Sequence, residues 1–190
     1  MAQLREFDRV RTLYEKYIEF DPTNSSAWIQ FAQFEAALAD YARARAIFEL
    51  GVSQSPLSYP ENLWKAYIDF EFEQGEREKT RALYERLVQL SGHVKVWRAY
   101  AEFEAAPIPM SATMREELGE EEEEEEEVKY VEGDVQLARQ VFDRAYRDLK
   151  SRDLKEEVPS FFFLVIIMYS LISTACCFIG RMEGVRATAW

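Results

Sequence analysis

A short aromatic pattern recurs three times along this chain, and its spacing constrains the fold more than any other feature. In each copy a tryptophan is followed by aromatic residues three and six positions later and by a glutamate seven positions later. The tryptophans stand at positions 28, 64 and 97, so the interval between copies is nearly constant. Repeats of this length are typical of proteins built from stacked supersecondary units, in which each unit contacts its neighbours. The three copies are Trp28–Glu35, Trp64–Glu71 and Trp97–Glu104.

A second pattern alternates with the first. It consists of an arginine, an aromatic residue three positions later and an acid directly after the aromatic residue, and it begins at Arg11, Arg45, Arg81 and Arg139. The arginine stands seventeen positions after the tryptophan in the first two repeats and forty-two positions after it in the third. The third repeat therefore carries an insertion of twenty-five positions, which contains a run of glutamates.

Both patterns predict α-helix. Because successive residues of a helix are about 100° apart, positions i, i+3 and i+6 share one third of its circumference, which is the width of a buried face. Pro22 and Pro56 follow the second pattern, where proline ends a helix, and Pro60 stands where the next helix would begin. We therefore predict an all-α fold, an α-solenoid of antiparallel helix pairs, each about 34 residues long.

The same spacing divides the chain into segments. Counting the tryptophan-to-arginine interval back from Arg11 places the first helix of that pair before Met1, and the tryptophan after Arg139 is expected at about 155–158. Those positions hold no tryptophan and an apolar stretch follows, so we interpret the chain as a piece of a longer array. The predicted solenoid covers 1–157, with repeats at about 1–22, 24–56, 60–91 and 94–152, an acidic insertion at 105–132 and an apolar tail at 158–190.

The net charge of −12 is concentrated in one segment. Ten acids lie within Glu116–Glu127, and without them the formal net charge is −2. The rest of the chain is therefore not a basic surface of the kind that tracks a nucleic-acid backbone. The glutamate run between Pro107 and Gly133 is expected to be a solvated, disordered insertion, and binding of a basic partner is the alternative.

The aromatic and charged residues of the repeat each have a structural and a functional interpretation. The rings could stack on single-stranded RNA, but their alignment on one helical face favours packing between helices. The arginines could bind phosphate, but a repeat glutamate precedes each of the last three and would need a cationic partner if half buried. We predict structural roles for Trp28, Phe31, Glu35, Arg45, Trp64, Tyr67, Glu71, Arg81, Trp97, Tyr100, Glu104 and Arg139.

The spacing of the charges predicts which of them meet. The glutamate lies ten positions before the arginine in two repeats, and in the third the insertion adds to that interval. We therefore hypothesise a bridge between the two helices of one repeat. The predicted pairs are Glu35–Arg45, Glu71–Arg81 and Glu104–Arg139.

No pattern in the sequence indicates catalysis or a metal site. His93 is the single histidine, and the adjacent Cys176 and Cys177 are remote from it. The chain has no transition-metal spacing, no glycine-rich phosphate loop and no nucleophile motif. We expect a protein that is not an enzyme, with no cofactor, no metal and no small-molecule substrate.

The segment 161–179 consists almost entirely of apolar residues and has no charge. By length it could form a short transmembrane helix. It could also be a divergent buried helix, since the repeat calls for another first helix here. A third hypothesis is translation of a retained intron after Glu157, because every valine codon begins with the GT of a splice donor. We favour the third hypothesis and leave the other two open.

The combined pattern resembles the half-a-TPR (HAT) repeat, a helix pair found in RNA-processing scaffold proteins. Longer strings look like the crooked neck-like family of pre-mRNA-splicing factors, over about residues 4–157. The strings are Val10–Tyr17, Ala42–Glu49, Leu63–Glu71 and His93–Trp97.

This resemblance implies a nuclear, non-enzymatic scaffold of the spliceosome. The implied partners are spliceosomal and nineteen-complex proteins, with RNA contacted mainly indirectly and membrane association not expected. One alternative is a HAT scaffold of another RNA pathway, such as ribosomal RNA maturation or 3′-end processing. Another is a membrane-tethered TPR-like adaptor that uses the apolar tail.

Overall fold

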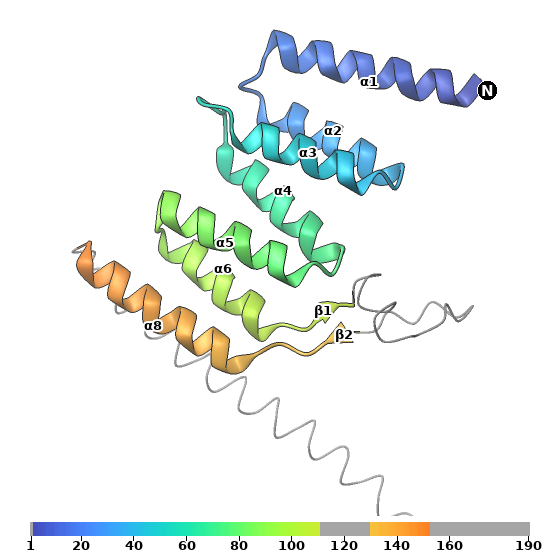
Figure 1. The fold of residues 1–190 in the computed structure, drawn as a ribbon. Helices are drawn as coiled ribbons and strands as arrows, with labels where there is room; N and C mark the ends of the chain where they lie inside the picture. Colours follow the sequence, from blue (N-terminus) through green and yellow to red (C-terminus); the bar gives the residue numbers. More distant parts are fainter. Residues whose placement is uncertain (1, 111–129, 153–190) are drawn as a thin grey trace, which may run out of the picture. The chain divides into compact units, whose positions relative to one another are not determined.

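The computed structural model describes residues 2–110 and 130–152, and Figure 1 shows their arrangement. The chain divides into two compact parts, residues 1–80 and 81–190, and each is described by itself. The glutamate run, the apolar segment 161–179 and the tail 158–190 lie outside the described residues. Within the described ranges no helix combines the length and the apolar character needed to cross a membrane.

Helices account for nearly all of the regular structure. The first part contains α1 (Ala2–Phe20), α2 (Ser25–Ala37), α3 (Tyr41–Val52) and α4 (Pro60–Glu73). Helix α5 (Arg77–Ser91) crosses the division between the parts. The second part continues with α6 (Val94–Ala105), the short strands β1 (Ile108–Pro109) and β2 (Tyr130–Val131), and α8 (Val135–Ser151).

The helices pair as the repeat predicts. In the first part α2 packs against α3, and both contact α4, while α1 packs against α2. In the second part α6 packs against α8. Helices α2, α4 and α6 carry the tryptophan pattern, and helices α1, α3, α5 and α8 carry the arginine pattern. We call them first-type and second-type helices. The all-α solenoid of helix pairs is confirmed.

Polar side chains cap the helices at the turns. The Asn24 carboxamide oxygen accepts hydrogen bonds from the backbone N–H groups of Ser26 and Ala27 at the start of α2. Asp40 and Asp134 accept backbone N–H groups in the same way at α3 and α8. His93 Nδ1 accepts the N–H of Lys95, at 3.1 Å, at the start of α6. These side chains satisfy N–H groups that have no partner within the helix.

One backbone hydrogen bond recurs in the turn between the two helices of each pair. The N–H of the residue before the second-type helix donates to the carbonyl of the repeat glutamate. The bonds are Asp40 to Glu35 at 3.0 Å, Glu76 to Glu71 at 3.0 Å and Asp134 to Glu104 at 2.7 Å. In the first two bonds the donor stands five positions after the acceptor. In the third bond the insertion stands between the two residues in the sequence, and the same hydrogen bond is still formed.

The two ends of the insertion are held together where they leave the turn. Strands β1 and β2 are antiparallel, with Ile108 opposite Val131 and Pro109 opposite Tyr130. Ile108 is 1% exposed, and its side chain anchors the pair of strands in the core. At Gly133 the two ends come closest, because a Cβ there would lie 2.2 Å from the carbonyl oxygen of Ala105. The sequence at that position therefore needs glycine.

Candidate functional site

The tryptophans and their aromatic partners lie inside the structure. Trp28 and Trp64 are each 6% exposed and Trp97 is 3% exposed. The aromatic residue three positions later is buried in every copy. Rings covered in this way present no face to a nucleic-acid base, so the geometry agrees with packing and not with stacking on RNA.

The rings pack in an arrangement that repeats between consecutive helix pairs. The aromatic residue of a second-type helix stacks on a ring of the following first-type helix, and it also makes a tilted contact with the ring three positions further along. The stacked pairs are Tyr14–Phe31 at 5.2 Å, Phe48–Tyr67 at 5.0 Å and Tyr84–Tyr100 at 5.3 Å between centroids. The tilted pairs are Tyr14–Phe34, Phe48–Phe70 and Tyr84–Phe103.

A buried ion pair accompanies each stack. Glu35 and Glu71 are fully buried and Glu104 is 1% exposed. Each carboxylate accepts two parallel hydrogen bonds from the Nε and Nη2 atoms of one arginine. The distances are 2.9 and 2.8 Å for Arg11–Glu35, 2.5 and 2.8 Å for Arg45–Glu71, and 2.6 and 2.9 Å for Arg81–Glu104. This fork geometry is the strongest form of arginine–carboxylate contact.

The predicted pairings Glu35–Arg45 and Glu71–Arg81 are wrong, and Glu104–Arg139 stays a prediction. Glu71 is bound by Arg45 of the preceding repeat, and Arg81 binds Glu104 of the repeat that follows its own. The reason is visible at α3, which contacts both α2 and α4, and whose Arg45 binds the glutamate of the later helix. Arg139, the last member of the predicted signature, lies in α8 with Nη1 3.5 Å from the side-chain oxygen of Gln136.

A bridge within one repeat is formed by a different arginine, Arg43. Arg43, two positions before Arg45, places Nε 3.2 Å from Glu35 Oε1, and its Nη2 lies 3.2 Å from Glu15. Glu35 is therefore held by Arg11 from one side and by Arg43 from the other. The sequence prediction missed Arg43 because the equivalent position of the next repeat holds a lysine, Lys79, so the arginine is not part of the repeated pattern.

The carboxylates change the proton affinity of the arginines that they bind. The hydrogen bond with Glu71 raises the pKa of Arg45 above its ordinary value, and burial opposes that shift. The hydrogen bond with Glu35 raises the pKa of Arg11 in the same way. Both guanidinium groups are therefore charged at neutral pH and supply the counter-charge of the buried carboxylates.

A second set of carboxylates, on the second-type helices, binds tyrosines. The hydroxyl of Tyr67 donates to Glu49 at 2.9 Å, and the hydroxyl of Tyr100 donates to Glu85 at 2.7 Å. Burial, and then the neighbouring carboxylate, raise the pKa of both tyrosines. The one sequence signal for this contact is the change from phenylalanine to tyrosine at the middle aromatic position, since Phe31 has no hydroxyl to donate.

In the second part of the chain the contact between Tyr100 and Glu85 is extended by Arg144 and Trp97. Arg144 of α8 donates to both oxygens of Glu85, at 2.6 and 2.7 Å, and its guanidinium lies 5.7 Å from the centre of the Trp97 ring. The hydrogen bonds from Arg144 and then from Tyr100, against the effect of burial, hold the pKa of Glu85 below its ordinary value. Sequence reasoning did not select Arg144, which lies outside both repeat patterns.

Taken together, the ring stacks and the arginine–glutamate forks hold one helix pair against the next. Among the described residues no group of histidine, cysteine and acid side chains could hold a metal ion. Some large apolar side chains remain at the surface, and none of them is a tryptophan or other signature ring of the two repeat patterns. In the first part they are Leu13, Tyr17, Phe20, Tyr41, Leu50 and Tyr59.

Comparison with known proteins gives relatives with names from pre-mRNA splicing. The chain is 53% identical over 156 residues to "Pre-mRNA-splicing factor CLF1" of Paracoccidioides brasiliensis. The aligned region covers 82% of this chain and 22% of that protein. It is 46% identical over 155 residues to "Crooked neck-like protein 1" of Mus musculus, and this aligned region covers 82% of this chain and 19% of that protein. The chain thus spans about a fifth of the length of the curated relatives it matches.

A family match accounts for the repeat. The description "PRP39 N-terminal HAT repeat" matches residues 1–118, which include α1 to α6. The matched region contains all three arginine–glutamate forks and all three ring stacks described above. By sequence and by the packing of its helix pairs, this chain belongs to the HAT-repeat family.

Proposed function

We propose that this chain is a non-enzymatic scaffold segment in pre-mRNA splicing, which holds spliceosomal proteins together through its HAT repeats. Relatives that are identical at about half of the aligned residues are named as pre-mRNA-splicing factors. The single observation that supports a scaffold is the burial of the repeat residues. Because the aromatic rings and carboxylates are used for packing, the outward faces of the helices are free to vary and to bind partners.

The proposed partners are proteins of the spliceosome and of the nineteen complex, in the nucleus, with RNA bound mainly through those proteins. The near-neutral charge outside the glutamate run supports the indirect role of RNA, since direct backbone binding needs a basic surface. Two exposed aromatic residues are candidates for a partner contact. Phe20 is 87% exposed and Tyr59 is 71% exposed.

These two side chains flank turns that the structure ties together. The backbone N–H of Ser58, next to Tyr59, donates to the carbonyl of Thr23 at 2.8 Å, and the Ser58 hydroxyl donates to the same oxygen at 2.7 Å. The turn after α1 and the loop before α4 therefore form one edge of the first part. A pair of aromatic side chains at a fixed edge is a suitable anchor for a protein partner.

The test is purification of the tagged full chain from nuclear extract, followed by sequencing of the RNA that accompanies it. Enrichment of spliceosomal small nuclear RNAs supports the proposal, and enrichment of pre-ribosomal RNA in their place overturns it in favour of another RNA pathway. A chain that pellets with membranes after carbonate extraction would instead be the tethered adaptor.

Variants connect the result to the surface. Phe20→Ser with Tyr59→Ser is expected to lower the recovered small nuclear RNA several-fold, because exposed aromatic anchors carry much of an interface energy. Glu19→Gln, an exposed neighbour on α1, is the matched control and should leave recovery unchanged. Equal recovery with both variants would show that partners bind elsewhere on the chain.

A further inference from the structure

Two side chains of α2 hold the edge formed by the turn after α1 and the loop before α4. The Ser25 hydroxyl donates a hydrogen bond to the carbonyl of Ser58, and the indole N–H of Trp28 donates to the carbonyl of Pro22 at 2.9 Å. These bonds fix the backbone beside both exposed rings of the edge. The rings therefore stand on a preorganised surface, which lowers the entropic cost of binding a partner.

Tyr59 has a backbone conformation that a tyrosine does not favour. Its φ and ψ angles are 54° and 57°, in the left-handed region that asparagine and glycine adopt more readily. It stands at the N-cap of α4 and forms no side-chain cap hydrogen bond there, whereas Asn24 caps α2 with two. Because its ring is 71% exposed, packing does not compensate. The stability of the fold therefore does not explain a tyrosine at this position, whereas a contact between its ring and a partner would.

A carboxylate accompanies each of the two rings. Asp21 directly follows Phe20, and the exposed Glu61 stands two positions after Tyr59, in the first turn of α4. Lysine and arginine are absent from the two segments that carry these groups, which are residues 17–26 and 53–62. The edge thus combines aromatic rings with negative charge. We call the surface formed by Phe20, Asp21, Tyr59 and Glu61 the aromatic edge.

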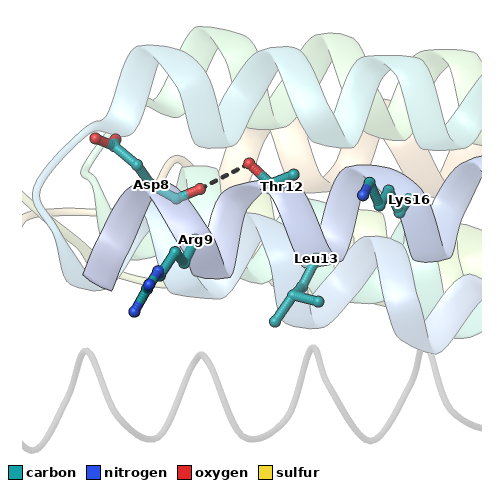
Figure 2. Close-up of a pocket in the computed structure, with 5 residues that line it drawn as sticks. All are labelled: Asp8, Arg9, Thr12, Leu13 and Lys16. Atoms are coloured by element: carbon teal, nitrogen blue, oxygen red, sulfur yellow. Dashed lines mark hydrogen bonds between the residues drawn. The ribbon is translucent and has the colours of Figure 1, made fainter. Parts of the chain in front are cut away.

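The side of α1 offers a different kind of surface. Figure 2 shows a hollow there, which is lined by Asp8, Arg9, Thr12, Leu13 and Lys16. The lining contains one carboxylate and two basic side chains, and it contains no aromatic ring. The Thr12 hydroxyl is turned back onto the helix, where it donates to the carbonyl of Asp8 at 2.9 Å. A cation therefore has less reason to bind at this hollow than at the aromatic edge.

We propose that the aromatic edge binds an extended segment of a partner protein through the arginine side chains of that segment. A planar guanidinium stacks on an aromatic face, and its N–H groups form a fork with a carboxylate, so arginine uses both features of the edge. Lysine carries the same charge but forms neither the flat stack nor the fork. The inference rests on the proposed function, because it specifies the chemistry of the partner at the edge described there.

The test is fluorescence anisotropy with three labelled twelve-residue peptides, in which glycine alternates with arginine, with lysine or with alanine. Each peptide is titrated into the full chain in which Glu120–Glu127 are replaced by glutamine, so that the glutamate run does not bind the cationic peptides. We expect saturable binding of the arginine peptide, at least ~3-fold tighter than binding of the lysine peptide, because only arginine combines the stack with the fork. The alanine peptide should not bind.

Variants of the two rings separate binding from stability. Tyr59→Asn should weaken the arginine peptide at least ~5-fold, because an aromatic anchor is removed. The same variant should raise the urea midpoint of unfolding, because asparagine accepts the left-handed conformation and can cap α4. Phe20→Ser should weaken the peptide to a similar extent. The matched control is Tyr130→Asn, at a tyrosine of β2 that is 60% exposed, which should leave binding unchanged and should not raise the midpoint.

A charge variant assigns the carboxylate. Glu61→Gln should weaken the arginine peptide at least ~2-fold and reduce the preference for arginine over lysine, because the fork loses its charged acceptor. Asp8→Asn, at the hollow on α1, is the matched control and should leave binding unchanged.

Three results would overturn the proposal. They are a lack of saturable binding of the arginine peptide, equally tight binding of the lysine or the alanine peptide, and equal affinities of the Tyr59→Asn and Tyr130→Asn chains. None of them changes the recovery of small nuclear RNA from nuclear extract, so failure of this proposal is distinguishable from failure of the proposed function.

Discussion

Replacing one side of the Arg45–Glu71 fork should destabilise the chain far more than replacing both sides together. Glu71 is fully buried, and both of its carboxylate oxygens are bound by Arg45, which is 28% exposed and also lies over the Phe70 ring at 5.8 Å. Removing the arginine leaves a carboxylate in the interior without a counter-charge. Losses of about 3–5 kcal/mol are typical when one partner of a buried pair is removed.

The double variant has a different expected cost. Arg45→Met with Glu71→Leu replaces the pair by apolar side chains of similar volume, and such replacements are often close to neutral. If each single change costs about 3 kcal/mol and the double change costs about 1–2 kcal/mol, the coupling energy is on the order of 4 kcal/mol. Lys65 and Asp69 provide a matched control on α4, because this exposed pair is joined at 2.5 Å one turn apart. Its coupling should be no more than about 0.5 kcal/mol.

The assay is urea unfolding of the full chain, followed by circular dichroism at the helix band, for the four members of each cycle. Comparing the midpoints and slopes of the curves separates a change in stability from a change in the unfolding transition. A coupling for Arg45 and Glu71 as small as that of the control pair would refute the reasoning. It would mean that solvent reaches Glu71 or that the fork is replaced by other contacts in solution.

Three further changes test the remaining contacts. Because the pKa of Tyr67 is raised, its stabilising effect is present below pH 10 and is lost as the pH rises further, so Tyr67→Phe should flatten the fall in stability above pH 10 in urea titrations. The pKa of Glu85 is lowered, mainly by Arg144, so its contribution to stability is present above about pH 4.3 and is lost as the pH falls below that value. Arg144→Leu should therefore reduce this acid dependence in thermal melts between about pH 3 and 6, while the hydrogen bond from Tyr100 remains. Gly133→Ala should cost about 1–3 kcal/mol in urea unfolding, because its Cβ would meet a backbone carbonyl at 2.2 Å, whereas Glu132→Ala next to it should be nearly neutral.

The helix pairs could be predicted from sequence because two independent signals agree. Aromatic periodicity predicts the helices, and the constant spacing of Trp28 to Arg45 and of Trp64 to Arg81 predicts the turns. The size of the insertion followed from the same spacing, and the turn bond between Asp134 and Glu104 has the geometry of the other two turns. Local periodicity was sufficient here because each helix pair is built within one repeat.

The pairing of the charges could not be predicted, because it depends on contacts between repeats. Glu71 lies ten positions before Arg81 and 26 residues after Arg45, and helical periodicity does not distinguish the two partners. One signal was present but ambiguous. Arg11 carries the full second pattern with no repeat glutamate before it in the given sequence, and Glu35 is the repeat glutamate that it binds. Arg144 had no signal, since its partner Glu85 is 59 residues away.

The forks also set where such an array tolerates cutting or duplication. The sequence repeat runs from a first-type helix to a second-type helix, but the fork joins a second-type helix to the first-type helix that follows, as α3 to α4 and α5 to α6. The fork is therefore out of phase with the sequence repeat by one helix. A boundary placed after Glu35 and before α3 keeps Arg11 with its carboxylate, whereas a boundary after Phe20 separates them. Chimeras joined within a helix pair should accordingly keep the fork between Arg11 and Glu35 and lose the contact of Arg43 with Glu35, whereas chimeras joined between pairs should do the reverse.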